Sequence, residues 1–256
     1  MEQTPTEPKT PVKTAQTTFR ILETLKSLDG ATVTELASHL DIPKSSAHNY
    51  LRTLEHEGYV VESGGEYEVG LRFLDLGGYA RSRERLYTVA TPELKRLAET
   101  TGEYANLLVE EHGLGVFLAR DRGEHAVSLD SYTGQSVRLH TTALGKTILA
   151  YLPRERVESI IDRHGLPAKT ERTITDRETL FEALAEIRQR ECAHDREERI
   201  KGLNCVAVPV LSGESITGAL SVSGPVSRMD EDRIEDEILP ELRRAANIIE
   251  LNQTHS

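Results

Sequence analysis

The chain has 256 residues, of which 38% are hydrophobic and 29% are charged, so it is long enough for two domains with buried cores. A formal net charge of −11 argues against a protein that binds nucleic acid over a uniformly basic surface. No apolar run reaches membrane-spanning length, and the polar residues 1–11, rich in Thr and Pro, do not read as a signal peptide. We therefore expect a cytoplasmic protein with no membrane contact and a disordered lead over residues 1–11.

The first 70 residues have the element order of a winged helix-turn-helix. Apolar residues at helical spacing predict three helices, over residues 13–28, 34–40 and 44–57, with Thr32 or Thr34 as the cap of the second. Asp41-Ile42-Pro43 leaves only a tight turn before the third helix. Two β-prone runs, 59–61 and 67–69, then face each other across the turn 62–66. This order predicts a DNA-binding domain over residues 12–70, whose third helix enters the major groove.

The third helix has one polar side. Ala47, Tyr50, Leu51 and Leu54 form its apolar stripe, and Pro43–Leu54 contains no acidic residue. A local face without acids can bind phosphate even on an acidic protein. The residues that we predict to contact DNA are Lys44, Ser45, Ser46, His48, Asn49 and Arg52.

Residues 71–86 predict a linker helix, with apolar Leu71, Leu74, Leu76 and Tyr79 ahead of several arginines. A helix between two domains is a common place for a chain to pack against its own copy. A dimer would supply two recognition helices for paired half-sites. We therefore expect self-association, as a dimer or a dimer of dimers.

Residues 87–256 predict an α+β domain with an antiparallel sheet. Helices are expected over residues 92–100, 142–152, 154–164, 176–190 and 230–252, and the last must kink or restart at Pro240. Strands are expected over residues 104–111, 114–121, 127–130, 203–211 and 215–223. Such a domain leaves a concavity that suits a small ligand.

Five pieces of the chain, in this order, resemble the IclR family of transcriptional regulators. They are IPKSS (42–46) followed by LRTLEHEGYV (51–60), LHTTALGK (139–146), DREE (195–198), GLNCVAVPV (202–210) and LSVSGP (220–225). The resemblance runs from Val12 to the last helix. It implies an N-terminal winged helix-turn-helix, a linker helix and a C-terminal GAF-like effector domain that binds a small molecule and controls binding to double-stranded promoter DNA.

The resemblance also implies where the effector binds. The family's pocket residues, carried over to this chain, are Ala143, Leu144, Asp195, Cys205, Ser221 and Ser223. Their chemistry agrees, because backbone N–H groups at the start of a helix attract an anion or a polar oxygen. Two serines two positions apart on a strand place both hydroxyls on one side. An organic acid or a sugar derivative suits this lining.

Three features depart from the family's pattern. Thr17 stands where members often have Arg early in the first helix, which removes one expected phosphate contact. The wing tip, residues 62–66, is acidic where members often carry basic residues. Glu191-Cys192 replaces a Gly followed by an aromatic residue, which places Cys192 as a candidate for altering one pocket wall.

Other functions compete with this interpretation. Cys205, His140 and Asp195 include the residue types of a thiol hydrolase, and Cys192, His194 and Cys205 include metal-ligand types. Neither set has the spacing of a known motif, so we expect no enzyme, no metal site, no disulfide and no cofactor. A third alternative is a ligand sensor that acts through protein contacts without specific DNA binding, which the acidic wing favours.

Overall fold

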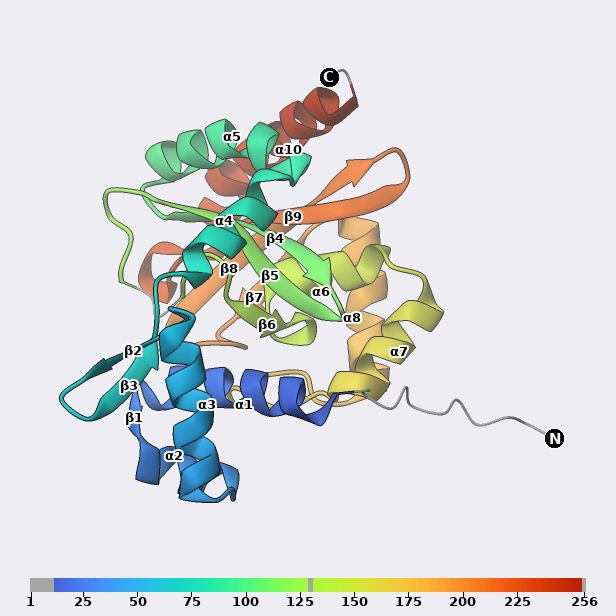
Figure 1. Ribbon diagram of the computed structural model, residues 1–256. Helices are drawn as coiled ribbons and strands as arrows, with labels where there is room; N and C mark the ends of the chain where they lie inside the picture. Colours follow the sequence, from blue (N-terminus) through green and yellow to red (C-terminus); the bar gives the residue numbers. More distant parts are fainter. Residues whose placement is uncertain (1–11, 129–130, 255–256) are drawn as a thin grey trace. The chain divides into compact units, whose positions relative to one another are not determined.

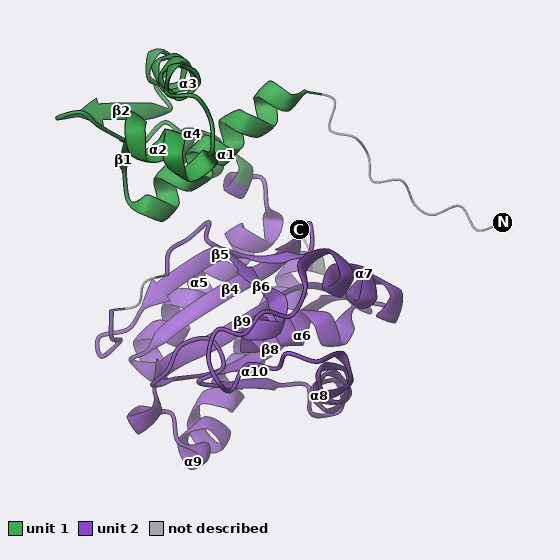
Figure 2. Ribbon diagram, turned by 90° about the horizontal axis from the view of Figure 1, so that it is seen from below, with its two compact units in different colours: residues 1–80 green, residues 81–256 purple. Residues whose placement is uncertain are grey.

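The computed structural model describes residues 12–128 and 131–254. The predicted lead, residues 1–11, lies outside these ranges. The chain forms two compact units, the first ending at Ala80 and the second beginning at Arg81, and Figure 2 colours them separately. Among the described residues, no helix has both the length and the apolar character needed to cross a membrane.

The first unit contains the three predicted helices, α1 (Lys13–Leu28), α2 (Val33–Leu40) and α3 (Lys44–His56). They form where apolar residues recur at helical spacing, and they bury one face each. The core consists of Ile21, Leu25, Leu36, Ala37, Leu40, Ala47, Leu51 and Leu54, together with Val60 and Tyr67 from the strands. The predicted stripe of α3 is therefore confirmed, with Tyr50 half-buried at the edge.

Local hydrogen bonds fix where α2 begins and how it turns into α3. Thr32, not Thr34, is the N-cap of α2, because its hydroxyl accepts from the backbone N–H of Glu35 while the Glu35 carboxylate accepts from the Thr32 N–H. Asp41 ends α2 in the left-handed conformation. Pro43 then begins α3 as its N-cap, with an extended ψ that no helix interior would accept. Thr32 thus fixes the start of α2, and Asp41 and Pro43 together produce the tight turn between α2 and α3.

The wing is a small antiparallel sheet. It consists of β1 (Ala31–Thr32), β2 (Val60–Ser63) and β3 (Glu66–Val69), in the order β1-β3-β2. The turn is tighter than the predicted residues 62–66, because Ser63 pairs with Glu66 and only Gly64 and Gly65 remain, both with positive φ. β1 was not predicted, since two residues are too few for a periodic pattern.

The predicted single helix over residues 71–86 is wrong. The structure has α4 (Phe73–Ser82), a break, and then α5 (Arg85–Thr101). α5 begins seven residues before the expected start at residue 92, so Pro92 lies inside it. Proline lacks an N–H and usually breaks a helix interior, but Leu86, Ala90 and Leu94 on the two sides of Pro92 are buried in one core, and this packing favours a continuous helix.

The second unit contains a six-stranded antiparallel sheet, which confirms the predicted fold class (Figure 1). Its strands are β4 (Tyr104–Glu111), β5 (Leu114–Arg122), β6 (Ser136–Arg138), β7 (Ala193–Arg196), β8 (Leu203–Ser212) and β9 (Ser215–Pro225), in the order β6-β5-β4-β9-β8-β7. The strand predicted over residues 127–130 is wrong for its first two residues, because Val127 and Ser128 have no regular structure. Residues 129 and 130 lie outside the described ranges. β6 and β7 were not predicted, because each is too short to show alternation.

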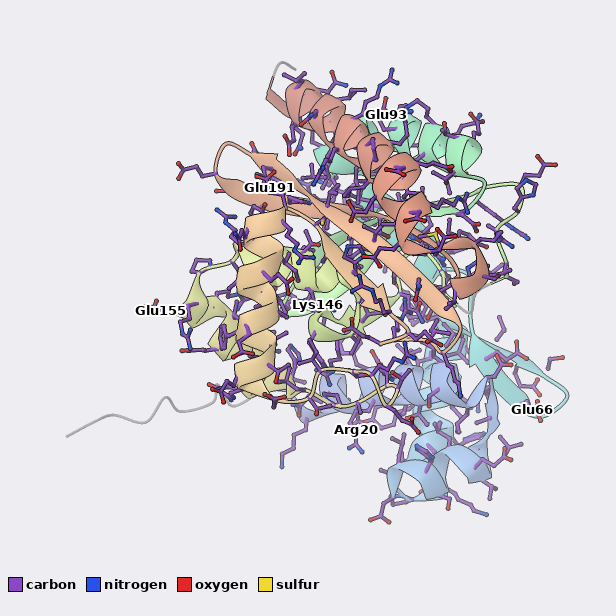
Figure 3. All side chains as sticks on the ribbon, turned by 180° about the vertical axis from the view of Figure 1, so that it is seen from behind. Arg20, Glu66, Glu93, Lys146, Glu155 and Glu191 are labelled. Atoms are coloured by element: carbon purple, nitrogen blue, oxygen red, sulfur yellow. The ribbon has the colours of Figure 1, made fainter. Side chains whose placement is uncertain are left out.

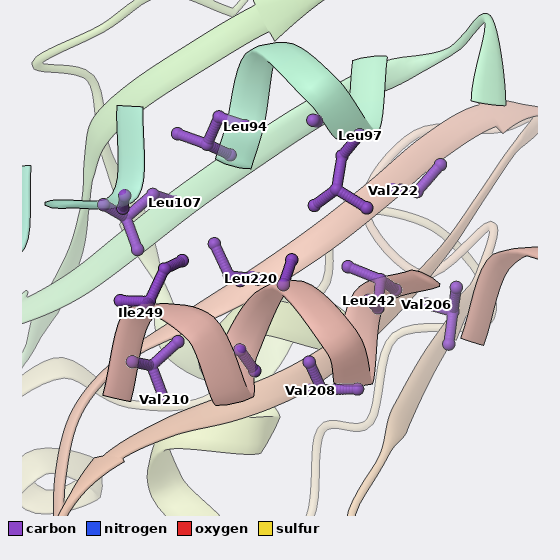
Figure 4. Packing of buried hydrophobic residues seen from close by; sticks show 14 of the residues in the cluster. Leu94, Leu97, Leu107, Val206, Val208, Val210, Leu220, Val222, Leu242 and Ile249 are labelled. Carbon is purple, nitrogen blue, oxygen red and sulfur yellow. The ribbon is translucent and has the colours of Figure 1, made fainter. Parts of the chain in front are cut away.

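Helices cover both faces of the sheet. On one face, α5 and α10 (Leu239–Thr254) pack on Leu107, Val206, Val208, Leu220 and Val222 (Figure 4). On the other face lie α6 (Ala143–Tyr151), α7 (Arg154–His164) and α8 (Arg177–Arg190) (Figure 1). A short 3₁₀ turn, η1 (Leu139–Thr141), leads into α6, and another, η2 (Val226–Arg228), follows β9. Even-numbered residues of β8 thus enter one core and odd-numbered residues the other.

The last helical region changes its hydrogen bonding at the expected place. α9 (Glu231–Arg233) runs into a π-helical turn, Ile234–Ile238, and α10 begins at Leu239, next to Pro240. Proline has no N–H to bond the preceding turn, so a local change in helix type accommodates it. The predicted restart at Pro240 is confirmed.

Candidate functional site

One pocket of the second unit is lined by all six residues that the sequence analysis assigned to the effector. Its volume is about 380 Å³ including its open mouth. The lining residues are Asn106, Phe117, Arg120, Ser131, Thr142, Ala143, Leu144, Asp195, Arg199, Leu203, Cys205, Ser221 and Ser223. Six residues from four separate segments of the chain therefore meet at one site.

Strand register brings the strand residues of the pocket together. Ser223 lies opposite Cys205 across β9 and β8, and Cys205 lies opposite Asp195 across β8 and β7. In the adjacent row, Arg120 of β5 lies opposite Asn106 of β4, which lies opposite Ser221 of β9. Residues directly opposite each other in a sheet share a face. All of these side chains therefore point to the face that α6 covers.

The first turn of α6 closes the other side of the pocket. Thr142 is its N-cap, and its hydroxyl accepts from the N–H of Gly145 at 2.9 Å. Ala143 and Leu144 occupy the first two helical positions, whose N–H groups have no carbonyl partner within a helix. Both residues are buried. The pocket therefore has backbone donors and a helix dipole on one side and polar strand residues on the other.

A hydrogen-bond network on the floor of the pocket was not predicted from the sequence. Arg120 donates from Nε to Asn106 Oδ1 at 2.8 Å. The amide nitrogen of Asn106 donates to the hydroxyls of Ser221 and Ser223, each at 3.2 Å. Asn106 is buried between apolar strand neighbours, and a lone amide in such a run was the signal available in the sequence. Arg199, next to the DREE segment, is a second arginine on the pocket wall.

A buried ion pair lies behind Asp195. Lys146 of α6, labelled in Figure 3, donates from Nζ to the carboxylate of Glu198 at 2.5 and 2.6 Å. The backbone N–H of Glu198 donates to Asp195 Oδ1 at 2.7 Å. Burial, with the nearby Glu198 carboxylate, raises the pKa of Asp195 to about 7. Asp195 is therefore partly protonated near neutral pH and is able to donate as well as accept a hydrogen bond.

The two cysteines lie on different faces of the sheet. Cys205 lines the pocket, and burial, with the nearby Asp195, raises the pKa of its thiol. Cys192 is buried in the other core, with α5 and α10, so the expectation that it alters a pocket wall is wrong. Glu191 before it ends α8 in the left-handed conformation with φ of 57°, a conformation that glycine adopts without strain.

The alternative sites are not assembled. His140 bonds the carbonyl oxygen of Pro167 at 3.1 Å and lines a separate pocket of about 230 Å³, away from Cys205 and Asp195. The three residues of the hydrolase alternative are therefore not brought together. His194 lies opposite Val206, whereas Cys205 lies opposite Asp195. His194 and Cys205 thus point to opposite faces, which rules out the metal site that uses both.

The predicted DNA-contacting residues lie on one side of α3. Lys44, Ser45, His48, Asn49 and Arg52 are exposed and Ser46 is half-buried. Within the described parts of the chain, neither Lys44 nor Arg52 forms an ion pair. Their charges are therefore available to phosphates. The wing carries acidic residues near its tip, with Glu66 labelled in Figure 3.

Comparison with known proteins decides the family. A family model described as "Bacterial transcriptional regulator IclR C-terminal" matches residues 79–251, and the "IclR helix-turn-helix domain" model matches residues 14–64. The chain belongs to the IclR family of transcriptional regulators. IclR-family proteins are DNA-binding regulators, not enzymes, with metabolite-binding C-terminal domains, and this IclR-family chain has both domains.

Individual IclR relatives match along almost the whole chain. The probable HTH-type transcriptional regulator ArcR of Halobacterium salinarum is 33% identical over 236 residues, 90% of each chain. The Thermotoga maritima IclR structure has a TM-score of 0.73 and 29% identity, covering 93% of this chain and 97% of that one. An IclR homolog from Microbacterium hydrocarbonoxydans, complexed with 4-hydroxybenzoate, has a TM-score of 0.76 and 27% identity over 93% and 98%. The resemblance seen in the sequence is confirmed.

The raised pKa of Asp195 predicts a pH-dependent effect of Asp195→Asn. The protonated carboxyl stabilises the fold below the unfolded-state pKa, and this stabilisation is lost as pH rises through about 7. Asn stays neutral and keeps an oxygen for the Glu198 N–H. We expect the free energy of unfolding of the variant, relative to wild type, to improve by on the order of 2 kcal/mol between pH 5 and pH 8, measured by urea unfolding. The exposed Asp236→Asn is the control, and a pH-independent difference would contradict the assignment.

Proposed function

We propose that this regulator reads promoter DNA with α3 and that a small metabolite, an organic acid or a sugar derivative, in the pocket around Asp195 and Ser221 changes its DNA affinity. The observation that carries the proposal is the convergence of the six assigned residues on one pocket. The same chain presents, after a tight turn, a helix whose exposed side carries no acid over residues 44–54. A ligand-binding unit joined to a DNA-binding unit is the arrangement that a metabolite-controlled regulator needs.

The face of α3 supports direct base recognition. Asn49 and Arg52 are exposed on adjacent turns of the helix. Asn pairs with adenine and Arg with guanine through two hydrogen bonds each in the major groove. Thr17 and the acidic wing provide few auxiliary phosphate contacts, so we infer that Lys44, Ser45, Ser46 and His48 supply most of the backbone contacts around these two readers.

Removing either reader should weaken specific DNA binding. We expect Arg52→Ala or Asn49→Ala to cost roughly 1–3 kcal/mol, about 5- to 150-fold in Kd, if the residue contacts a base. Gel shifts with the chain's own upstream DNA and with random DNA, at several salt concentrations, measure this. Arg163→Ala, an exposed charge on α7, controls for the loss of one positive charge. Unchanged affinity and sequence preference in both variants would show that α3 is not the reader.

The serine pair should be necessary for the effector response. Ser221→Ala with Ser223→Ala removes both hydroxyls and both acceptors of the Asn106 amide. We expect the double variant to lose the ligand-induced change in DNA affinity, a coupling typically of about 1–3 kcal/mol, while its ligand-free DNA binding stays intact. Ser212→Ala with Ser215→Ala, exposed on the same hairpin, is the control. A preserved ligand affinity in the double variant would remove the pocket assignment.

Self-association through α4 is a further part of the proposal. No residue of α4 is buried, and Leu71, Leu74 and Leu76 expose 82%, 69% and 52% of their surface. Exposed leucines on one short segment are typical of an interface. A dimer, or a dimer of dimers, would place two copies of α3 on paired half-sites.

A charge on α4 should then prevent assembly. We expect Leu74→Glu to shift the protein toward a monomer and to weaken binding to a palindromic site, because a carboxylate at an apolar interface loses its hydration. Light scattering during size exclusion measures the mass. Leu251→Glu, an exposed leucine of α10, controls for an added surface charge. An unchanged mass and unchanged DNA affinity for Leu74→Glu would place the interface elsewhere.

The second candidate function is a sensor that acts through protein contacts. The acidic side chains of the wing, Glu62, Glu66 and Glu68, favour it because they would repel DNA phosphates. The gel shifts above separate the two functions. A sensor would bind its own upstream DNA no better than random DNA, even at low salt.

A further inference from the structure

Arg120 is a half-buried cation whose partners in the described chain are all neutral. Its Nε donates to the Asn106 side chain at 2.8 Å and its Nη1 donates to the carbonyl oxygen of Ser131. The guanidinium carbon lies 4.7 Å from the ring centroid of Tyr104 and 5.4 Å from that of Phe117. Among the residues that the structure describes, Arg120 meets no carboxylate.

Two other buried ions of this unit have a partner of opposite charge. Lys146 contacts Glu198 at 2.5 Å, and the buried Glu103 contacts Arg228 at 2.6 Å. Burial lowers the pKa of Arg120, and the positive charge of Arg199 lowers it further. A desolvated charge without a counterion costs free energy. Because the chain has an excess of acids, a position that keeps such a cation is more readily explained by function than by stability.

The network around Arg120 leaves it ready for a ligand. The guanidinium has five N–H groups, and two of them are used in the contacts to Asn106 and Ser131. The remaining donors belong to the two terminal nitrogens, which can hold a carboxylate through two parallel bonds. Asn106 fixes the Nε edge, so the fork has a defined orientation toward the pocket that it lines.

We propose that Arg120 is the anchor for the effector's carboxylate, so that the effector is a small organic monoacid rather than a neutral sugar. This rests on the proposed function, since it takes the same pocket as the effector site. Phe117, Leu144 and Leu203 offer apolar walls for the carbon skeleton. The hydroxyls of Ser221 and Ser223 and the first turn of α6 remain for a second oxygen of the ligand.

The charges in the pocket favour a single negative charge over phosphate. Arg120, Arg199 and Asp195 line the pocket, so with Asp195 ionised their charges sum to +1, which a monoanion neutralises and a dianion exceeds. A planar carboxylate also matches the planar guanidinium fork. We therefore assign a carboxylate and not a phosphate group.

The test compares matched acids and neutral analogues on the full-length protein. The probes are lactate, benzoate and 4-hydroxybenzoate, each with its primary amide, together with a neutral pentose and inorganic phosphate. Thermal shifts identify binders and calorimetry measures Kd. We expect at least one acid to raise the Tm, while its amide, the pentose and phosphate do not, because binding to the native state stabilises it by mass action.

Two variants separate the anchor from general charge. Arg120→Gln keeps a donor toward Asn106 but removes the charge. Arg122→Gln removes an exposed arginine of the same strand that lies outside the pocket lining. Hydrogen bonds to charged groups are worth about 1.5–3 kcal/mol. We expect Arg120→Gln to raise the Kd for the acid by roughly 10- to 150-fold and Arg122→Gln to leave it unchanged.

A ligand-free comparison decides the question if no probe binds. Without its counterion, Arg120 should not stabilise the fold, so the Tm of ligand-free Arg120→Gln should equal or exceed that of wild type. A fall of several degrees would make Arg120 a structural residue and overturn the proposal. An acid that binds Arg120→Gln as tightly as wild type, or phosphate binding without acid binding, would also overturn it. If the pentose binds and Ser221→Ala with Ser223→Ala abolishes that binding, the metabolite switch stands and the carboxylate anchor fails.

Discussion

The pocket depends on the two-sided alternation of the central sheet. On β8, Val206 and Val208 pack against α5 and α10. Cys205, the residue before Val206, points to the opposite face and lines the pocket below α6. Each strand therefore places one apolar row in a core and one polar row in the pocket. Since side chains alternate with a period of two, a shift of one residue in β9 would turn Ser221 and Ser223 into the apolar core on the other face. The apolar core thus holds the register that the polar site requires.

Asn106 holds the polar side chains of the pocket in fixed positions. It lies between Arg120 and Ser221 on neighbouring strands and bonds both, and it also bonds Ser223. An amide is suited to this place because it accepts on one side and donates on the other. Aspartate would attract Arg120 but could not donate to the hydroxyls unless it were protonated. The neutral amide therefore orients the guanidinium without cancelling its charge.

Sequence patterns predicted the parts of the fold that are long and periodic. α1 and α7 begin and end at the expected residues, because apolar spacing and clear end signals coincide there. β1, β6 and β7 were missed because strands of two to four residues are held by their neighbours, not by their own pattern. α5 was predicted too short, since Pro92 suggests a boundary that tertiary packing overrides. The six pocket residues were named through resemblance, whereas Arg120 and Asn106 became visible only through cross-strand pairing.

The buried pair of Lys146 and Glu198 links the two sides of the pocket. Lys146 belongs to α6, whose first turn forms one wall, and the backbone of Glu198 holds Asp195 on the other wall. Breaking one partner of a buried pair is strongly destabilising, so α6 and the segment after β7 are constrained to move together. A ligand that contacts both walls would therefore act on α6 and the segment after β7 as one rigid unit. These two elements pack on one face of the sheet, and the other face carries α5, the helix that follows α4 in the chain.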